Sequence, residues 1–282
     1  MTDTDRRLAS ETGATGPARR PDEPPSGLEW AVRDAWVEAS RHLRIVPRNP
    51  ELLMFATIQP VMFVLLFVYV FGGAIEVPGF SDYQQFLIPG IFAQSIVFGS
   101  SFTSVGIAED LQKGYIDRLR SLPMSRSAVL VGRTLSDLVR NCITFVVMLI
   151  VAFLVGFRFE GSLLEALAAT GLLLIFSYSF SWIQALIGLS VKSVEAANSA
   201  GFIWMFPLTF VSSAFVEPSQ MPDWLEPIAR NNPFTIVTNA CRALYNGLPV
   251  GSDAIIAMAW AGGIIAVFAY LSIRRFSEST VG

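Results

Sequence analysis

Residues 167–189 read LAATGLLLIFSYSFSWIQALIGL, a run of 23 residues without a charged side chain. A helix of about 20 apolar residues crosses the hydrocarbon core of a bilayer, which is roughly 30 Å thick. The backbone of such a segment must be helical, because each unpaired N–H or C=O group in hydrocarbon costs several kcal/mol. This stretch therefore predicts a membrane-spanning helix.

Five further stretches have the same character, and the composition of the whole chain agrees with them. Of the 282 residues, 52% are hydrophobic and only 15% are charged, against the ~25% charged residues of ordinary soluble domains. The six uncharged stretches are residues 52–71, 87–107, 141–157, 167–189, 199–215 and 254–273. The predicted fold class is an all-α integral membrane protein with six transmembrane helices.

Basic residues are distributed unevenly between the two sides of these predicted spans. The segments 1–51, 108–140 and 190–198, together with the C-terminus, contain 17 of the 20 Lys and Arg residues. Cytoplasmic loops of membrane proteins are enriched in Lys and Arg. We therefore expect a multi-pass protein of the plasma membrane with both termini in the cytoplasm.

The chain divides into four predicted parts. Residues 1–26 lack an apolar core and have the composition of a disordered cytoplasmic tail. Residues 27–50 predict an amphipathic interfacial helix followed by a turn, because apolar side chains recur there at helical spacing. Residues 51–276 form the six-span domain, and residues 277–282 form a second cytoplasmic tail.

Several functional classes are excluded or disfavoured. A net charge of −3 gives no basic footprint for nucleic acid. The single histidine, His42, and the absence of ionisable residues from the six stretches disfavour an intramembrane enzyme, a metal site or an ion-coupled carrier. Neither Lys113 nor Lys192 lies in a phosphate-binding loop motif, so we expect no nucleotide or other cofactor on this chain. A secondary carrier and a membrane enzyme or scaffold are retained as rival interpretations.

The loop over residues 109–140 reads EDLQKGYIDRLRSLPMSRSAVLVGRTLSDLVR. It predicts a short amphipathic helix that ends at a proline, followed by a helix from residue 126 to residue 157 that is too long for the bilayer. The first half of that long helix carries a charged stripe, which we expect to project into the cytoplasm: Arg126, Arg133, Asp137 and Arg140. We interpret the short helix as one that docks in a groove of a soluble partner; a solvated loop is the alternative.

The segment 110–133 resembles the cytoplasmic loop of the type-2 ABC exporter permeases, in particular the daunorubicin-resistance-type membrane subunits. The run RNNPFT at residues 230–235 is similar to the external segment that precedes the last span in that family. The resemblance implies a cytoplasmic coupling helix that docks onto an ATP-hydrolysing subunit. The residues implied in docking are Leu111, Tyr115, Asp117, Arg118, Leu119, Arg120, Leu122, Pro123 and Arg126.

The same resemblance implies a function. The chain would be the membrane permease subunit of an ATP-driven ABC exporter, a homodimer bound to two ABC ATPase subunits that hold ATP and Mg. The expected substrate is an amphipathic drug, lipid or secondary metabolite. Export of a polysaccharide or glycolipid by the same machinery is the alternative.

Two further groups of residues are candidates for the transport path and for the dimer interface at which it would lie. Neutral polar and aromatic side chains within the spans predict the path itself: Gln59, Phe63, Phe67, Gln94 and Phe98. Ordinary packing against helices and lipid is the alternative. Small residues such as Gly90, Ser95 and Gly99 would allow close helix approach at a dimer interface.

The external segment 216–253 is too polar to span. In the family it forms short helices that dip into the membrane, which implies an external gate at Trp224, Asn232, Pro233 and Phe234. An ordinary interfacial loop is the alternative for this segment.

Overall fold

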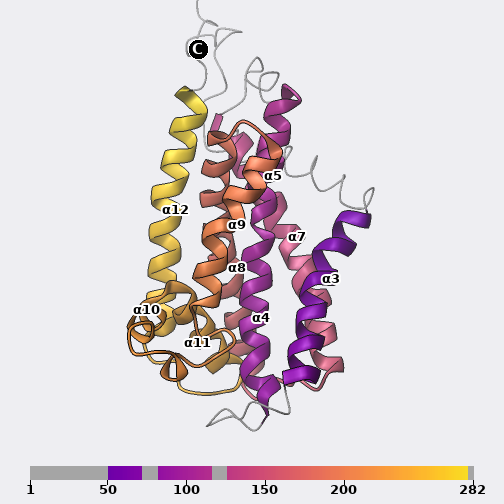
Figure 1. Ribbon diagram of the computed structural model, residues 1–282, viewed down its shortest axis with the longest axis vertical. Helices are drawn as coiled ribbons and strands as arrows, with labels where there is room; N and C mark the ends of the chain where they lie inside the picture. The colour runs from indigo at the N-terminus through magenta and orange to yellow at the C-terminus, as the bar shows by residue number, and fades with distance from the viewer. Residues whose placement is uncertain (1–49, 72–81, 116–125, 279–282) are drawn as a thin grey trace, which may run out of the picture.

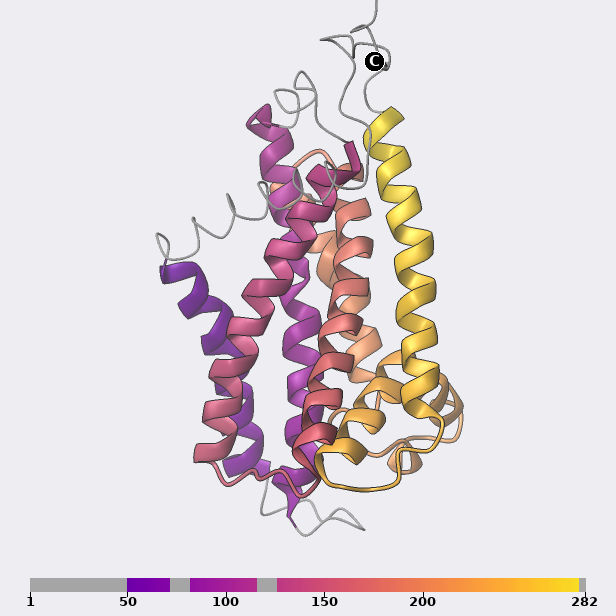
Figure 2. The same cartoon turned by 180° about the vertical axis from the view of Figure 1, so that it is seen from behind.

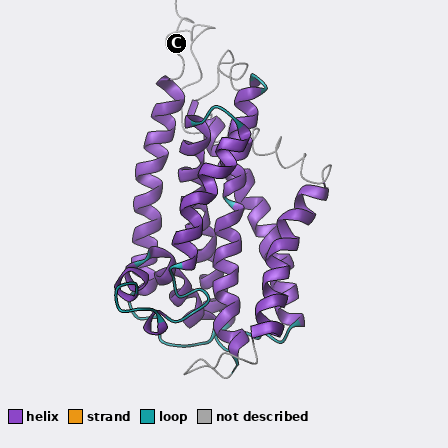
Figure 3. Ribbon diagram, in the orientation of Figure 1, coloured by secondary structure: helices purple, strands orange, loops and turns teal. Residues whose placement is uncertain are grey.

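A computed structural model describes residues 50–71, 82–115 and 126–278, and all regular structure in these residues is helical (Figures 1 and 3). The elements are α3 (Pro50–Leu66), its continuation as a π-helical turn (Phe67–Phe71), α4 (Tyr83–Gly99), α5 (Ser101–Gln112), α7 (Arg126–Leu154), α8 (Leu163–Ser190), α9 (Val194–Phe210), a 3-10 turn (Pro218–Gln220), α10 (Glu226–Asn231), α11 (Pro233–Tyr245) and α12 (Asp253–Glu278). The two predicted tails, apart from residues 277 and 278, and the interfacial helix before residue 50 lie outside the described residues.

Each of the six predicted spans falls mainly or wholly within a helix. Four helical stretches are long and apolar enough to cross a membrane: Tyr83–Gln112, Val129–Leu154, Leu163–Ser190 and Asp253–Ser277. The other two predicted spans correspond to α3 and α9, which have 17 residues each and are therefore about 25 Å long at 1.5 Å per residue. The multi-pass helical class is confirmed, and the count of six crossings stays a prediction.

The long helices lie side by side along the long axis of the molecule (Figures 1 and 2). The ends of α5, α8 and α12 and the starts of α7 and α9 lie at one end of the bundle. The short helices α10 and α11 lie at the opposite end. The described segments that the charge pattern assigns to the basic side thus share one end of the bundle, away from the predicted external segment.

Local sequence explains where two of these helices begin. Ser162 and Glu165 form a reciprocal capping box at the start of α8, in which each side chain binds the other residue's backbone N–H. The Ser193 hydroxyl accepts a hydrogen bond from the backbone N–H of Ala196 and caps α9. The Ser193 cap thus follows the turn between α8 and α9, whereas the capping box of α8 follows the connection from α7, at the other end of α8.

The core centres on α4. The candidate span Tyr83–Gln112, which includes α4 and α5, is 83% buried, whereas the span in α12 is only 11% buried and lies at the edge. Phe92 in α4 makes edge-to-face contacts with Phe145, Phe157 and Tyr245 at ring-centroid distances of 5.1, 5.9 and 6.1 Å. Such aromatic pairs add about 0.5–1.5 kcal/mol each beyond their buried area. They connect α4 to α7 and α11 at the end of the bundle where the short helices lie.

A break at Ser100 separates α4 from α5. The Ser100 hydroxyl donates to the Val97 carbonyl at 2.6 Å, and the Ser101 hydroxyl donates to the Phe98 carbonyl at 2.7 Å. Serine side chains that bond to the preceding turn in this way bend helices. The bend lies next to the polar site described below.

The glycines of α4 make close contacts within the chain. A β-carbon at Gly90 would overlap the backbone oxygen of Ala214, and one at Gly99 would overlap the side-chain oxygen of Asn141. The close approach that these small residues allow is therefore between elements of one chain, rather than at the predicted dimer contact.

We predict that Gly90→Ala lowers the thermal stability of the purified protein. The added methyl group meets backbone rather than a movable side chain, and overpacking of this kind costs about 1–3 kcal/mol. Gly171→Ala is the matched control, because a β-carbon at Gly171 has no neighbour within 4 Å and alanine favours a helix over glycine by about 1 kcal/mol. Equal melting temperatures for the two variants would contradict the packing described here.

Candidate functional site

A cavity of about 80 Å³ lies between α3, α4, α5, α7 and α9. Four of the five side chains predicted for the transport path line it: Gln59, Phe63, Gln94 and Phe98. The fifth, Phe67, is not among the lining residues and stacks on Phe215 at a ring-centroid distance of 4.9 Å. The structure thus brings together residues from two predicted spans that the sequence could only nominate one by one.

Further polar lining of the cavity comes from α7, which the sequence did not nominate for the transport path. Arg140, Asn141 and Thr144 line this side. The spacing of four residues between Arg140 and Thr144 places both on one face of a helix, which was the available signal. Phe202 of α9 contributes a further aromatic wall.

Gln94 has no hydrogen-bond partner in the part of the chain that the structure describes. The residue is 1% exposed, and neither its amide nitrogen nor its amide oxygen reaches a protein group. Neighbouring Asn141 is satisfied, because its amide nitrogen donates to the Ile96 carbonyl at 3.2 Å and to the Ser177 hydroxyl at 2.9 Å. An unpaired buried amide costs about 1–3 kcal/mol, and Gln94 of α4 is a buried lining group of the cavity that bears this cost.

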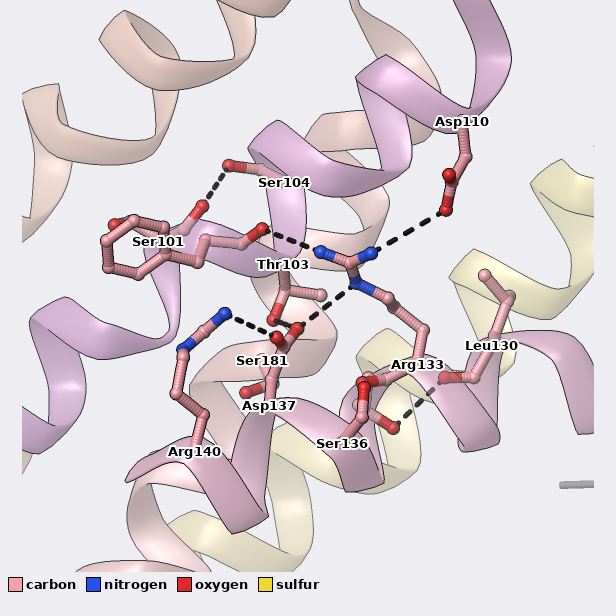
Figure 4. A network of polar contacts seen from close by, with 12 residues as sticks. Ser101, Thr103, Ser104, Asp110, Leu130, Arg133, Ser136, Asp137, Arg140 and Ser181 are labelled. Atoms are coloured by element: carbon pink, nitrogen blue, oxygen red, sulfur yellow. Dashed lines mark hydrogen bonds and ion pairs between the residues drawn. The ribbon is translucent and has the colours of Figure 1, made fainter. Parts of the chain in front are cut away.

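A buried ionic network lies beside the cavity (Figure 4). The Asp137 side chain is only 3% exposed and pairs with Arg140 at 2.9 Å and with Arg133 at 3.5 Å. The Thr103 hydroxyl of α5 donates to the same carboxylate at 2.6 Å. One carboxylate therefore holds two guanidinium groups of α7 and one hydroxyl of α5, an arrangement that we call the Asp137 clamp.

The arginines of the clamp extend to the preceding helices. Arg133 pairs with Asp110 of α5 at 3.6 Å and lies where a side chain at Gly106 would otherwise be. The Arg140 guanidinium donates to the Gly99 carbonyl at 3.0 Å and lies 4.5 Å from the ring centroid of Phe102. The clamp thus fastens α7 to both sides of the break between α4 and α5.

These contacts correct the interpretation of the charged stripe. Arg133, Asp137 and Arg140 face α5 instead of solvent, and they lie inside Val129–Leu154, the stretch of α7 that is long and apolar enough to cross a membrane. The predicted border at residue 141 excluded them because a lone charge in hydrocarbon is costly. Pairing lowers that cost. The span predicted over residues 141–157 still contains no charged residue, and where the membrane begins along this helix stays a prediction.

The implied docking residues are described only in part. Leu111 and Tyr115 are half-buried and pack against the chain's own cluster around Trp182 and Phe276. Asp117, Arg118, Leu119, Arg120, Leu122 and Pro123 lie outside the described residues, and Arg126 is described only as the first residue of α7. The coupling helix therefore stays a prediction.

Of the four residues implied in an external gate, Asn232 and Pro233 lie at a helix start, whereas Trp224 and Phe234 differ in their exposure. The Asn232 amide nitrogen donates to the carbonyls of Leu208 and Val211 at 2.7 and 2.6 Å, while its oxygen accepts from the backbone N–H of Phe234 at 2.8 Å. Asn232 thus caps the end of α9 and the start of α11, where Pro233 is the first helical residue. Trp224 is 71% exposed, whereas Phe234 is fully buried.

Arg242 is a structural residue of this end that the sequence did not nominate. It is buried, its Nε donates to the Phe86 carbonyl at 2.8 Å, and its Nη2 donates to the Ser213 carbonyl at 2.7 Å. Burial lowers the pKa of its guanidinium, and the charge of Glu217 opposes that shift. The side chain fixes α11 to the start of α4.

Comparison with known proteins gives a consistent result. The sequence profile of the ABC-2 type transporter family matches residues 34–246. The daunorubicin resistance ABC transporter permease protein DrrB1 of Streptomyces coeruleorubidus is 33% identical over 227 residues, which cover 80% of either chain. The probable doxorubicin resistance ABC transporter permease protein DrrC of Mycobacterium tuberculosis is 24% identical over 84% of this chain and 86% of its own length. The probable multidrug ABC transporter permease YbhR of Escherichia coli is 25% identical over 58% of this chain and 44% of its own length.

We predict that Asp137→Asn strongly destabilises the protein. The change keeps the shape of the side chain but leaves two buried arginines without their shared carboxylate, and breaking a buried pair in this way costs about 3–5 kcal/mol. Glu109→Gln is the control, since Glu109 forms an exposed pair with Lys113 and such pairs contribute about 0–1 kcal/mol. Thermal unfolding in detergent measures both variants, and similar losses would contradict the clamp.

Proposed function

The chain belongs to the ABC-2 type transporter family, and we propose that it is the membrane permease subunit of an ATP-driven exporter. The observation that carries this conclusion is the family match over residues 34–246. That range contains the cavity, the Asp137 clamp and the whole loop from residue 109 to residue 140. The family match therefore includes all residues of the candidate site.

The proposed assembly is a homodimer of this chain with two ABC ATPase subunits, which bind ATP and Mg. Six crossings with both termini in the cytoplasm fit the shared end of the basic segments in the bundle. Lys113 and Lys192 do not belong to a phosphate-binding loop motif, which supports a division of labour between a permease and a separate source of energy.

The proposed mechanism couples the loop after α5 to the cavity. ATP binding on the partner would move the coupling helix predicted around Tyr115 to Leu122, in the segment that joins the end of α5 to the start of α7. Because Arg133 joins Asp110 of α5 to Asp137 of α7, these helices move together instead of sliding apart. Arg140 belongs both to the clamp and to the wall of the cavity, so the movement reaches the transport path.

The proposed substrate is an amphipathic drug or lipid. Phenylalanines Phe63, Phe98, Phe102 and Phe202 supply much of the wall of the cavity, which suits an apolar ring or chain better than a polysaccharide. Two of the relatives are described as drug-resistance permeases by name. The names of the relatives and the aromatic wall together favour drug export over the export of a polysaccharide or glycolipid.

We predict that Leu119→Asp or Arg118→Glu abolishes co-purification with the ATPase and ATP-dependent export, while folded protein is retained. Each change places an acidic side chain on the helix expected to contact the partner. Arg230→Glu is the matched control, because Arg230 is an exposed basic residue in α10 at the other end of the bundle. Normal assembly and export by both loop variants would contradict the proposed docking helix.

A further inference from the structure

We propose that the cavity around Gln94 is a polar subsite that receives a neutral carbonyl or hydroxyl group carried on an aromatic ring of the exported molecule. This inference rests on the proposed export function and specifies the substrate class. It assigns Gln94 as the residue that recognises the polar group and the surrounding phenylalanines as the residues that hold the ring.

The unpaired amide of Gln94 is the first argument. Its nitrogen and its oxygen both lack protein partners although the residue is 1% exposed and lines the cavity. An amide offers donors and acceptors side by side. A hydroxyl can both donate to and accept from it, and a carbonyl can accept from its nitrogen, whereas an apolar group leaves the amide unsatisfied.

The aromatic wall is the second argument. Phe98 makes edge-to-face contacts with Phe202 and Phe206 of α9 at ring-centroid distances of 5.7 and 5.2 Å. Phe98 and Phe202 line the cavity together with Phe63. Aromatic rings prefer offset or edge-to-face partners at these distances, so a planar ring can join the cluster without loss of its existing contacts.

Access to the subsite is the third argument. A neighbouring cavity of about 290 Å³ shares Ser101, Phe102 and Phe202 with the first and reaches the exposed residues Glu195 and Asn198 near the start of α9. Its volume approaches the roughly 300 Å³ at which pockets begin to accommodate drug-sized ligands. The body of the ligand thus has space next to the small polar end formed around Gln94.

Charge decides which polar group fits. Among the described residues, no carboxylate side chain lines the inner cavity, and the charged lining group is Arg140. The guanidinium of Arg140 is already directed toward Asp137 and the Gly99 carbonyl. A cation at this position would be desolvated without an acidic partner, and an anion would find its counter-charge already paired. A neutral hydrogen-bonding group is the one that gains a partner in Gln94 without either cost.

The test uses two probes that share a ring system, 9-anthracenemethanol and 9-methylanthracene. Their affinities are measured by fluorescence titration of the complete complex of permease and ATPase in nanodiscs, for the wild type and for Gln94→Leu. We expect the preference for the alcohol over the methyl probe to fall by about 3- to 10-fold in the variant, which corresponds to one hydrogen bond. Because the ratio is compared between proteins, the different partition of the probes into lipid cancels.

Two control variants separate recognition from packing. Gln84→Leu makes the same change on the same helix, outside the cavity, and should leave the preference unaltered. Phe202→Ala removes an aromatic wall and should weaken both probes by the same factor. Gln94→Met is measured alongside Gln94→Leu, so that the comparison stands if the leucine variant folds poorly.

An unchanged preference in both Gln94 variants would overturn the subsite and indicate that the cavity holds water alone. ATP-dependent transport of the two probes is followed separately in proteoliposomes that contain the same complex. Loss of the preference without transport would leave the subsite intact and contradict the export function. Transport with an unchanged preference would contradict only the subsite.

Discussion

Asp137 carries a carboxylate within the helix bundle, and the position of the surrounding helices depends on how that charge is compensated. Arg133 and Arg140 approach it from one turn before and one turn after on α7, and Thr103 approaches from α5. Desolvation of charged groups is affordable in such a place only when each group has partners. The compensation therefore requires α7 and α5 to stay in contact.

The contacts of the clamp also explain small residues that surround it. Gly106 leaves room for the guanidinium of Arg133, and Gly99 leaves room for the side chain of Asn141. The hydroxyl groups of Ser100 and Ser101 bond to the preceding turn at the break, and bonds of this kind bend a helix. The cavity lies beside this bend, with Arg140 as the residue common to both.

This arrangement gives the proposed coupling a physical basis. A push on the loop after α5 acts on two helices that share ion pairs, and the shared pairs end at the wall of the cavity. An interhelical network with two discrete arrangements can transmit such a movement over a distance. The shape of the aromatic wall around a bound amphipathic molecule would then depend on the nucleotide state of the partner ATPase subunit.

Much of the helical framework could be predicted from the sequence, because charge-free runs in a membrane protein leave the backbone no alternative to a helix. The sequence also nominated four residues that line the cavity, because a glutamine is unusual within an apolar run and aromatic rings lie close to it in the same spans: Gln59, Phe63, Gln94 and Phe98. The sequence places Asp137 on a charged face but does not specify what that face meets, so its burial against α5 was not predicted.

The same limit applies to other contacts between distant segments. The capping role of Asn232 and the insertion of Arg242 between α11 and α4 depend on backbone carbonyls supplied by other helices. Carbonyl groups are identical at every residue, and therefore no sequence pattern marks the ones that a side chain will reach. Contacts of this kind become visible only when the helices are placed in space.

The central claim is that this chain provides a path and a separate ATPase provides the energy. The most direct measurement is accumulation of a fluorescent amphipathic drug in sealed proteoliposomes containing the permease alone, its ABC ATPase partner alone, or both. The account predicts accumulation only with both proteins and hydrolysable ATP. Accumulation by the permease alone, driven by a proton or sodium gradient without ATP, would contradict it.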